Sequence, residues 1–324
     1  MSERLRTMDT IKGFARQGKK AIQPFYNRLY VDTNTNYRNS IFLAGTGRSG
    51  TTWVSDIINF KREYRYIFEP FYNAEVDLCR RFEEIQYLRP DNQDEYYLAA
   101  AKDILSGKIR NQWTDQYHRS FISEKRLIKD IRTNLMLKWI NSHFPEIPII
   151  FLMRHPCAVA KSKLRGKGWS SDLDLFLNQP ALVDDFLQPF LAEIKAIKTD
   201  FEGHIFRWCL ENYVPLKQFQ PGQMLVTFYE NFCEDPIPEI KRMFSFLEKP
   251  YDEAVLTKLK TPSPVTRMDS KIVTGGSLIN GWREKITEQQ TDRAIEILSL
   301  FGLDKIYTQA SMPRLEGVQE VMGT

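Results

Sequence analysis

The segment "GTGRSGTTW" at residues 45–53 has the residue types of an anion-binding loop. Gly45 and Gly50 have the spacing of a P-loop, but Thr51 stands where a P-loop has its lysine. A cation is supplied instead by Arg48. The apolar run 41–44 precedes the loop, so backbone amides and the positive end of a helix dipole would surround one point. The pattern therefore predicts a phosphate or sulfate site.

Side chains within the loop add donors to the predicted site. Hydroxyl groups at Thr51 and Thr52 would lie at the start of the helix, and the Arg48 guanidinium can bind two oxygen atoms of an anion at once. The glycines permit a tight turn and a close approach of the backbone to the ligand. An alternative interpretation is a glycine-rich turn capped by a threonine pair, but the order strand, loop, helix favours the anion site.

A second cation follows another apolar run, in "IIFLMRHP" at residues 149–156. A nucleoside triphosphatase needs the P-loop lysine and an acid at a strand end to organise magnesium. Here the strand is followed by Arg154 and His155. A ligand with two separated anionic groups therefore fits the sequence better than Mg-ATP.

The elements that must position these residues predict an α/β fold. Short apolar runs bounded by turn residues alternate with longer helical patterns, which is typical of a central parallel sheet flanked by helices in a P-loop-like, three-layer arrangement. Helices are predicted to begin near Thr51, Leu135, Pro156 and Pro238. The predicted strands are 41–44, 66–68, 127–128, 149–153 and 224–228.

Residues 1–324 are predicted to form a single domain, because no repeat and no Pro/Gly/Ser-rich linker divides the chain. Residues 1–40 are interpreted as a basic N-terminal extension. Residues 167–200 are interpreted as an insertion that shapes the site of a second substrate, since insertions beyond the strand ends commonly do so. The aromatic residues of this insertion, Trp169, Phe176 and Phe186, are candidates either for substrate selectivity or for the core.

Composition narrows the classes of partner and compartment. A net charge of +4 is too small to indicate nucleic acid binding, although cations are concentrated in the first thirty residues. That basic segment predicts a solvated helix, with weak contact to an anionic membrane surface as the alternative. The four cysteines have no metal-binding spacing, and no apolar run is long enough to span a membrane. A cytoplasmic protein is therefore expected.

Two of these motifs resemble those of the sulfotransferases that use 3'-phosphoadenosine-5'-phosphosulfate (PAPS) as sulfuryl donor. "GTGRSGTTW" is similar to the loop that binds the 5'-phosphosulfate in this family, and "RHPCAVAKS" at 154–162 is similar to the element that binds the 3'-phosphate. The resemblance implies that Arg154 and Ser162 hold the 3'-phosphate. It extends from about residue 41 to residue 287 and implies PAPS as the co-substrate, with no metal required.

A third similarity places the adenine. "FYENFCEDPIPEIKRMFSFLE" from Phe228 is similar to the family's segment of strand, Tyr-Glu, Asp-Pro and amphipathic helix. The resemblance implies that Tyr229 lies near the adenine and that Trp53 stacks on it, whereas packing in the core is the alternative for Trp53. The full set of predicted cofactor-binding residues is Gly47, Arg48, Ser49, Gly50, Thr51, Thr52, Trp53, Arg154, Ser162, Tyr229 and Arg283.

The C-terminal similarity is partial. "GWREKIT" from Gly281 looks like the family's C-terminal segment, but Gly-Gly-Ser at 275–277 stands where many members have Arg-Lys-Gly. Those members use the Arg-Lys-Gly cations on the 3'-phosphate. Arg283, Lys271 or Arg267 are the candidates to replace them in this chain.

Glu69 is the candidate general base, and Arg48 is the residue expected to stabilise the leaving phosphate. "FEP" at 68–70 resembles the Phe-Glu-Pro element of carbohydrate sulfotransferases and some bacterial relatives. Burial would raise the pKa of Glu69 and Arg48 would oppose that rise. A structural glutamate paired with Arg48 or Arg132 is the alternative. Where cytosolic members have Lys-Thr-His with a catalytic His, this chain has Lys129 and Asp130.

The predicted function is therefore transfer of a sulfuryl group from PAPS to a hydroxyl. The Phe-Glu-Pro resemblance favours a glycan or other polyhydroxylated acceptor, and a secondary metabolite, lipid or polyketide is the alternative. A P-loop nucleotide kinase and a non-catalytic nucleotide-binding module are more remote alternatives. His155 is expected to bind or neighbour the nucleotide, and Lys129 is a second candidate cation near the transferred group.

Overall fold

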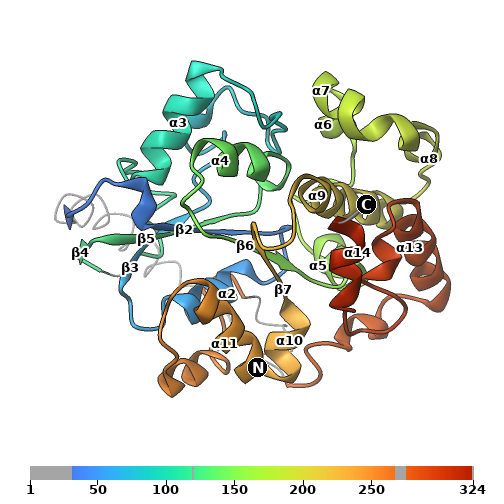
Figure 1. Ribbon diagram of the computed structural model, residues 1–324. Coiled ribbons are helices and arrows are strands. Elements are labelled where there is room, and N and C mark those ends of the chain that lie inside the picture. Colours follow the sequence, from blue (N-terminus) through green and yellow to red (C-terminus); the bar gives the residue numbers. More distant parts are fainter. Residues whose placement is uncertain (1–30, 119, 267–274, 323–324) are drawn as a thin grey trace, which may run out of the picture.

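The structure is a computed structural model that describes residues 31–118, 120–266 and 275–322. Its centre is a five-stranded sheet in which every pair of neighbouring strands is parallel, in the order β3-β5-β2-β6-β7 (Figure 1). The strands are β2 (Ser40–Ala44), β3 (Tyr64–Phe68), β5 (Lys125–Asp130), β6 (Ile149–Met153) and β7 (Leu225–Phe228). Short strands β1 (Val31–Asp32) and β4 (Ile122–Ser123) pair separately. The predicted α/β fold class is confirmed.

The apolar side chains of the strands alternate between two cores, because successive side chains of a strand point to opposite faces of the sheet. Phe42 and Ala44 of β2 belong to the larger core, whereas Ile41 and Leu43 belong to the smaller one. The strands are buried on both faces, which explains why they read as continuous apolar runs rather than alternating ones. Helices must therefore cover the sheet on both sides.

Helices α2 and α11 contribute to the smaller core, and α3, α4, α5, α9 and α13 contribute to the larger one (Figure 1). A helix layer on each face completes the three layers that the sequence predicts. The longer helices are α2 (Thr51–Ile58), α3 (Glu95–Leu105), α4 (Leu137–His143), α5 (Pro156–Leu164), α9 (Asp200–Gln218), α10 (Tyr229–Glu234), α11 (Pro236–Phe246), α13 (Glu288–Leu300) and α14 (Glu316–Met322).

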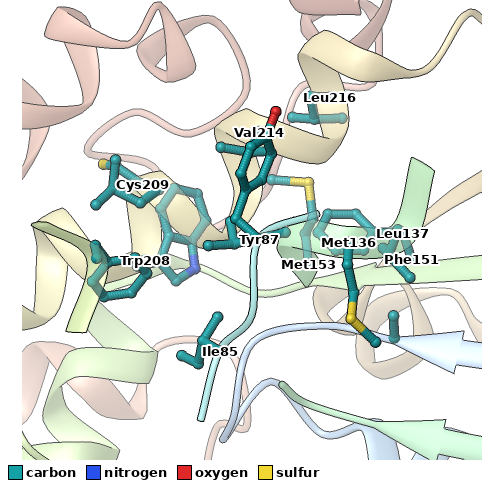
Figure 2. Close-up of a cluster of buried hydrophobic side chains, with 14 of the residues drawn as sticks. Ile85, Tyr87, Met136, Leu137, Phe151, Met153, Trp208, Cys209, Val214 and Leu216 are labelled. Carbon is teal, nitrogen blue, oxygen red and sulfur yellow. The ribbon is translucent and has the colours of Figure 1, made fainter. Parts of the chain in front are cut away.

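Helix α9 is the longest of the described helices, and the sequence analysis did not predict it. It starts with a capping box in which the Thr199 side chain and Glu202 bond each other's backbone amides. Trp208, Cys209, Val214 and Leu216 pack into the larger core together with residues of β6 and α4 (Figure 2). The helix is buried on nearly every side, so its sequence lacks the one-sided apolar periodicity by which surface helices are found.

Most other predicted elements are confirmed, with shifted ends. Strand β5 is longer than the predicted 127–128, and α11 starts at Pro236 rather than Pro238. A short 3-10 turn from Asn134 precedes α4, which itself begins at Leu137. The interval 167–200 holds short helices: α6 (Asp174–Leu177), α7 (Pro180–Leu182) and α8 (Leu191–Lys195), with two further turns at 183–190. Within it, Phe176 is fully buried and Phe186 packs against the larger core.

The basic segment predicted to be an N-terminal extension lies outside the described residues up to position 30, and residues 31–40 lead through β1 into β2. None of the helices within the described ranges is long and apolar enough to cross a membrane. The four cysteines, all among these residues, are unpaired.

Candidate active site

The loop at 45–50 connects the end of β2 to the start of α2, as the motif requires. Gly50 is the N-cap of α2 at φ +97°, and no side chain caps this helix end. A Cβ at position 50 would lie 2.6 Å from the Tyr229 ring, so glycine is needed for space as well as for conformation. Arg48 also has a left-handed backbone, at φ +78°. The helix end thus presents amides without a side-chain acceptor.

The second predicted anion site lies directly beside this loop. Arg154 follows β6, and Pro156 occupies the first turn of α5, where its missing N–H costs nothing. Arg48 Nε donates to Ser162 Oγ at 2.9 Å, and Arg154 Nη1 donates to the Arg48 carbonyl at 3.2 Å. The two motifs, more than a hundred residues apart in sequence, therefore form one cluster of donors.

Aromatic residues border this cluster. The Trp53 and Tyr229 ring centroids are 5.5 Å apart with planes inclined at 58°. The Arg154 guanidinium lies 4.0 Å from the Tyr229 ring centroid, and Trp53 Nε1 donates to the Lys258 carbonyl at 3.3 Å. Trp53 is only 6% exposed, so it serves as a core residue while part of it faces the site.

These residues line a cavity of about 630 Å³ at the carboxyl ends of the strands. An α/β sheet binds its ligands in this position. Of the predicted site residues, the cavity brings together Arg48, Gly50, Thr51, Thr52, Trp53, Glu69, Arg154, Ser162 and Tyr229.

Glu69 follows β3 and is 6% exposed. It occupies the left-handed region at φ +44°, which is uncommon for a residue with a side chain. Its Oε1 accepts from Lys129 Nζ at 2.5 Å and its Oε2 accepts from Arg132 Nη1 at 2.7 Å. Burial disfavours the charged carboxylate, but the two cations outweigh it and hold the pKa of Glu69 below its ordinary value.

The pairing of Glu69 differs in part from the sequence expectation. Arg48 was expected to oppose the effect of burial, but the charges that do so belong to Lys129 and Arg132. Lys129 is itself almost fully buried, with Nζ 4.5 Å from the Phe68 ring centroid. The neighbouring Asp130 accepts from the amides of Phe71 and Arg132, and burial raises the pKa of its carboxyl to about 6.

Gly47, Ser49 and Arg283 lie close to the site without lining the cavity. A Cβ on Gly47 would lie 2.6 Å from the Trp169 ring, so Trp169 covers this part of the loop. Ser49 is fully buried, and its Oγ has no hydrogen-bond partner. The Arg283 guanidinium donates to the Gln309 carbonyl and to Ser311 Oγ, which directs it away from the cavity.

His155 is a structural residue rather than part of the cavity lining. Its Nδ1 accepts from the Cys157 amide as the cap of α5, and its Nε2 lies 3.1 Å from the Thr308 carbonyl oxygen. Its ring stacks on Trp282 with centroids 4.5 Å apart. Burial lowers the pKa of His155 to about 4, so the imidazole is neutral. The His155 side chain therefore caps α5 and packs on Trp282, and it does not itself line the cavity.

Several cavity residues were missed at the sequence level. Lys161 and Arg165 line the cavity from α5 and the turn that ends it, together with Ala158 and Ser162. Their spacing of three and four residues puts them on one face of a helix, and this signal was available in the sequence. Lys285 and Ser277 approach from the C-terminal segment, whereas Lys271 and Arg267 lie outside the described residues.

A metal site is not evident where the structure describes the chain. No group of three or more His, Cys, Asp or Glu side chains there is arranged to hold a metal ion. Glu69 pairs with two cations, and Asp130 accepts from two amides. The expectation that no metal is needed stays a prediction.

A glycine-rich loop after one strand lies beside an arginine and a serine that follow the adjacent parallel strand, and this arrangement is typical of a P-loop-like α/β protein. The sulfotransferase domain family matches residues 38–298 of this chain. The protein therefore belongs to the sulfotransferase family and is a sulfotransferase enzyme.

Similar solved structures include two sulfotransferase domains. The domain from the Synechococcus PCC 7002 olefin synthase is 16% identical with a TM-score of 0.46, over 84% of this chain and 98% of that chain. The domain from the curacin biosynthetic pathway is 14% identical with a TM-score of 0.44, over 80% of this chain and 95% of that chain. Mouse sulfotransferase SULT7A1, complexed with PAP, is 14% identical with a TM-score of 0.42, over 83% of this chain and 86% of that chain.

Proposed function

We propose that the protein transfers a sulfuryl group from PAPS to an acceptor hydroxyl, with Glu69 as the general base. One observation carries this proposal: a single cavity holds the anion loop, the Arg154 and Ser162 pair, and a buried carboxylate. The first two supply sites for separated anionic groups of one ligand, and the carboxylate supplies a place for a proton.

The donor end of the cavity, lined by Arg48, Arg154, Lys161, Ser162 and Lys285, would hold the nucleotide. The 5'-phosphosulfate fits the loop amides at the start of α2, where the helix dipole favours an anion. The 3'-phosphate fits Arg154 and Ser162. Buried Nε of Arg154 lacks a hydrogen-bond partner, and buried donors of this kind are commonly satisfied by a ligand.

Lys161 and Lys285 are the best candidates to replace the absent Arg-Lys-Gly cations. Both line the donor end, and Lys161 Nζ also donates to the Gly281 carbonyl, which ties α5 to the C-terminal segment. Arg283, the residue favoured from the sequence, is directed towards Gln309 and Ser311 instead. The adenine would lie against Tyr229 and Trp53, whose rings border the same cavity.

In the proposed reaction the acceptor oxygen forms a bond to sulfur while the bond between sulfur and the bridging phosphate oxygen breaks. The acceptor proton passes to Glu69, and adenosine 3',5'-bisphosphate (PAP) leaves with the negative charge of the broken bond. Arg48 and the loop amides stabilise that charge. Lys129 and Arg132 hold the pKa of Glu69 below its ordinary value, so at neutral pH the carboxylate is in the unprotonated form that a base requires.

Nucleotide affinity tests the donor assignment. Isothermal titration should show that PAP binds at least about tenfold more tightly than AMP, since the 3'-phosphate adds charge-assisted hydrogen bonds. Arg154→Ala should remove most of this difference. Leu164→Ala, an exposed position on helix α5, is the control and should leave both affinities unchanged. Equal affinities of the unaltered protein for PAP and AMP would contradict the proposal.

A further inference from the structure

We infer that Tyr307 is a positioning residue for Arg154, because through Glu230 it fixes the peptide from which the Arg154 side chain reaches the donor end of the cavity. The inference rests on the proposed function, since it takes Arg154 as a contact of the 3'-phosphate. Tyr307 belongs to the C-terminal strap, residues 303–311, which follows helix α13. The strap lies beyond residue 298, where the match to the sulfotransferase domain family ends.

The peptide between Arg154 and His155 is held by buried side chains on both sides. Trp208 Nε1, from α9, donates to the Arg154 carbonyl at 3.0 Å. The His155 amide donates to Oε1 of Glu230, from α10, at 2.9 Å. Strand β6 ends at Met153, so these backbone groups lie past the ladder and take side-chain partners instead. The position of the peptide therefore depends on those two side chains.

Tyr307 fixes the carboxyl group that holds this peptide. Glu230 is buried, and its second oxygen, Oε2, accepts from Tyr307 Oη at 3.0 Å. A buried carboxyl oxygen without a donor is costly, so the hydroxyl sets the orientation of the whole group. The Tyr307 ring is fully buried and packs edge-on against His155 and Trp208, with centroids 5.3 and 5.7 Å apart. One tyrosine thus contacts the peptide's partners on both sides.

The C-terminal strap is itself firmly packed. The Thr308 carbonyl oxygen lies 3.1 Å from His155 Nε2, and Ile306 is fully buried. Helix α14 covers the strap so closely that a Cβ on Gly317 would collide with the Lys305 carbonyl. A strap fixed in this way can hold Tyr307, and through it the Arg154 peptide, in one place.

The Arg154 guanidinium depends on this support because its own bonds are few. Its one hydrogen bond within the described residues, from Nη1 to the Arg48 carbonyl, is 3.2 Å long, and its buried Nε has no partner. Its remaining contact is the face of the Tyr229 ring, 4.0 Å away. A guanidinium must be aimed accurately to bind a phosphate through two donors at once, so a fixed backbone matters here.

Isothermal titration with PAP and with AMP tests the inference. Tyr307→Phe keeps the ring and removes only the hydroxyl. It should weaken PAP binding about three- to tenfold and AMP binding less than about twofold, because the misplaced guanidinium serves only the 3'-phosphate. In the Arg154→Ala background, Tyr307→Phe should change PAP affinity less than about twofold, since the residue through which it acts is gone.

Tyr87→Phe is the matched control. Tyr87 is also a buried tyrosine whose hydroxyl donates to a carboxylate, that of Asp185 at 2.7 Å, but it does not line the cavity. Thermal denaturation should show a similar loss of stability in both variants, whereas the ratio of PAP to AMP affinity should fall in Tyr307→Phe alone. This ratio separates positioning from a general weakening of the fold.

A second pair of variants tests the link through Glu230. Glu230→Ala should lose most of the preference for PAP over AMP. Glu230→Gln should retain most of it, because the amide oxygen can still accept from the His155 amide. If Glu230→Ala does not fold, the comparison of Tyr307→Phe with Tyr87→Phe still decides the matter.

The outcomes distinguish the inference from the proposed function. If Arg154→Ala removes the preference for PAP and Tyr307→Phe does not lower it, the inference is overturned and the proposed function stands. Equal losses for PAP and AMP in Tyr307→Phe, or an undiminished effect in the Arg154→Ala background, would also overturn the inference alone. If the unaltered protein binds PAP and AMP equally, both are overturned.

Discussion

The donor end of the cavity and its acid end, which is formed by Glu69, Lys129 and Arg132, use charge in different ways. At the donor end, Arg48, Arg154 and Lys161 donate to hydroxyl or carbonyl oxygens, and cations outnumber carboxylates among the described lining residues. At the acid end, Lys129 and Arg132 both bond Glu69. One end is therefore suited to a ligand that brings its own negative charge, and the other to a neutral ligand that gives up a proton.

The two ends of the cavity therefore distinguish the two substrates by charge. An anionic nucleotide gains little at the acid end, where the cations are already engaged. A neutral alcohol gains little at the donor end, where it cannot compensate the excess of positive charge.

Glu69→Gln should lower kcat by roughly 10²- to 10⁴-fold, because the acceptor proton loses its base. Steady-state rates with PAPS and an acceptor alcohol measure this effect. The variant leaves two buried cations without their carboxylate, so its folding should be checked by thermal denaturation. PAP affinity should be unchanged, since the donor end is intact. Near-normal turnover would remove Glu69 as the base.

Lys129→Gln should move the acid limb of the kcat/KM profile to higher pH by about one unit or more. Burial favours the neutral acid, and Lys129 is the larger of the two opposing charges that keep the pKa of Glu69 low. Removal of this cation raises that pKa, so the base becomes protonated at a higher pH. Lys285→Gln removes the same charge from the donor end and should leave the limb in place. If the acid limb moves in both variants, the shift comes from the loss of positive charge around the cavity and not from the loss of the Lys129 contact with Glu69.

Lys161→Gln should weaken PAP binding by about fivefold, which corresponds to ~1 kcal/mol for a partly exposed charge contact. The affinity for AMP should change less, because the lost contact is assigned to the 3'-phosphate. Isothermal titration at two salt concentrations measures the effect, which should shrink at high salt. Lys167→Gln, an exposed cation that does not line the cavity, is the control. Equal losses for AMP and PAP would place Lys161 elsewhere on the nucleotide.

Metal chelation should have the smallest effect. EDTA should leave the rate of sulfuryl transfer unchanged, because Arg48 and the loop amides are proposed to stabilise the leaving phosphate without a metal. The measurement is the steady-state rate before and after chelation, with excess Mg²⁺ added back. A rate that collapses and is restored by Mg²⁺ would show that the transfer needs a metal ion.

The donor end could be predicted from sequence because its parts are contiguous. The loop at 45–53 and the segment at 154–162 each hold their predicted binding residues within nine positions. Adjacent parallel strands bring the two segments together. Lys161 was missed although it lies three residues after Ala158 and four before Arg165, spacing that puts all three on one side of the helix. The extent of the domain and the individual ligand roles stay predictions.

The acid end could be predicted only in part. Glu69 stood out because a carboxylate ends an apolar strand, but its partners come from β5 and the turn after it, some sixty residues away. Trp113 lies in a loop without regular structure and carries no motif, and its role follows only from its bond to the Glu69 carbonyl. Such contacts depend on how separate segments pack, which local patterns do not encode.

The strand order β3-β5-β2-β6-β7 sets a direction for the reaction. Along the carboxyl edge of the sheet, the segments after β3 and β5 carry the acid end, and those after β6 and β7 carry the donor end, with the anion loop between them. In the proposed reaction the sulfuryl group therefore moves sideways across the strands. Changes after β3 and β5 can give the protein a new acceptor while the nucleotide contacts stay constant, so acceptor choice can diverge on an unchanged donor platform.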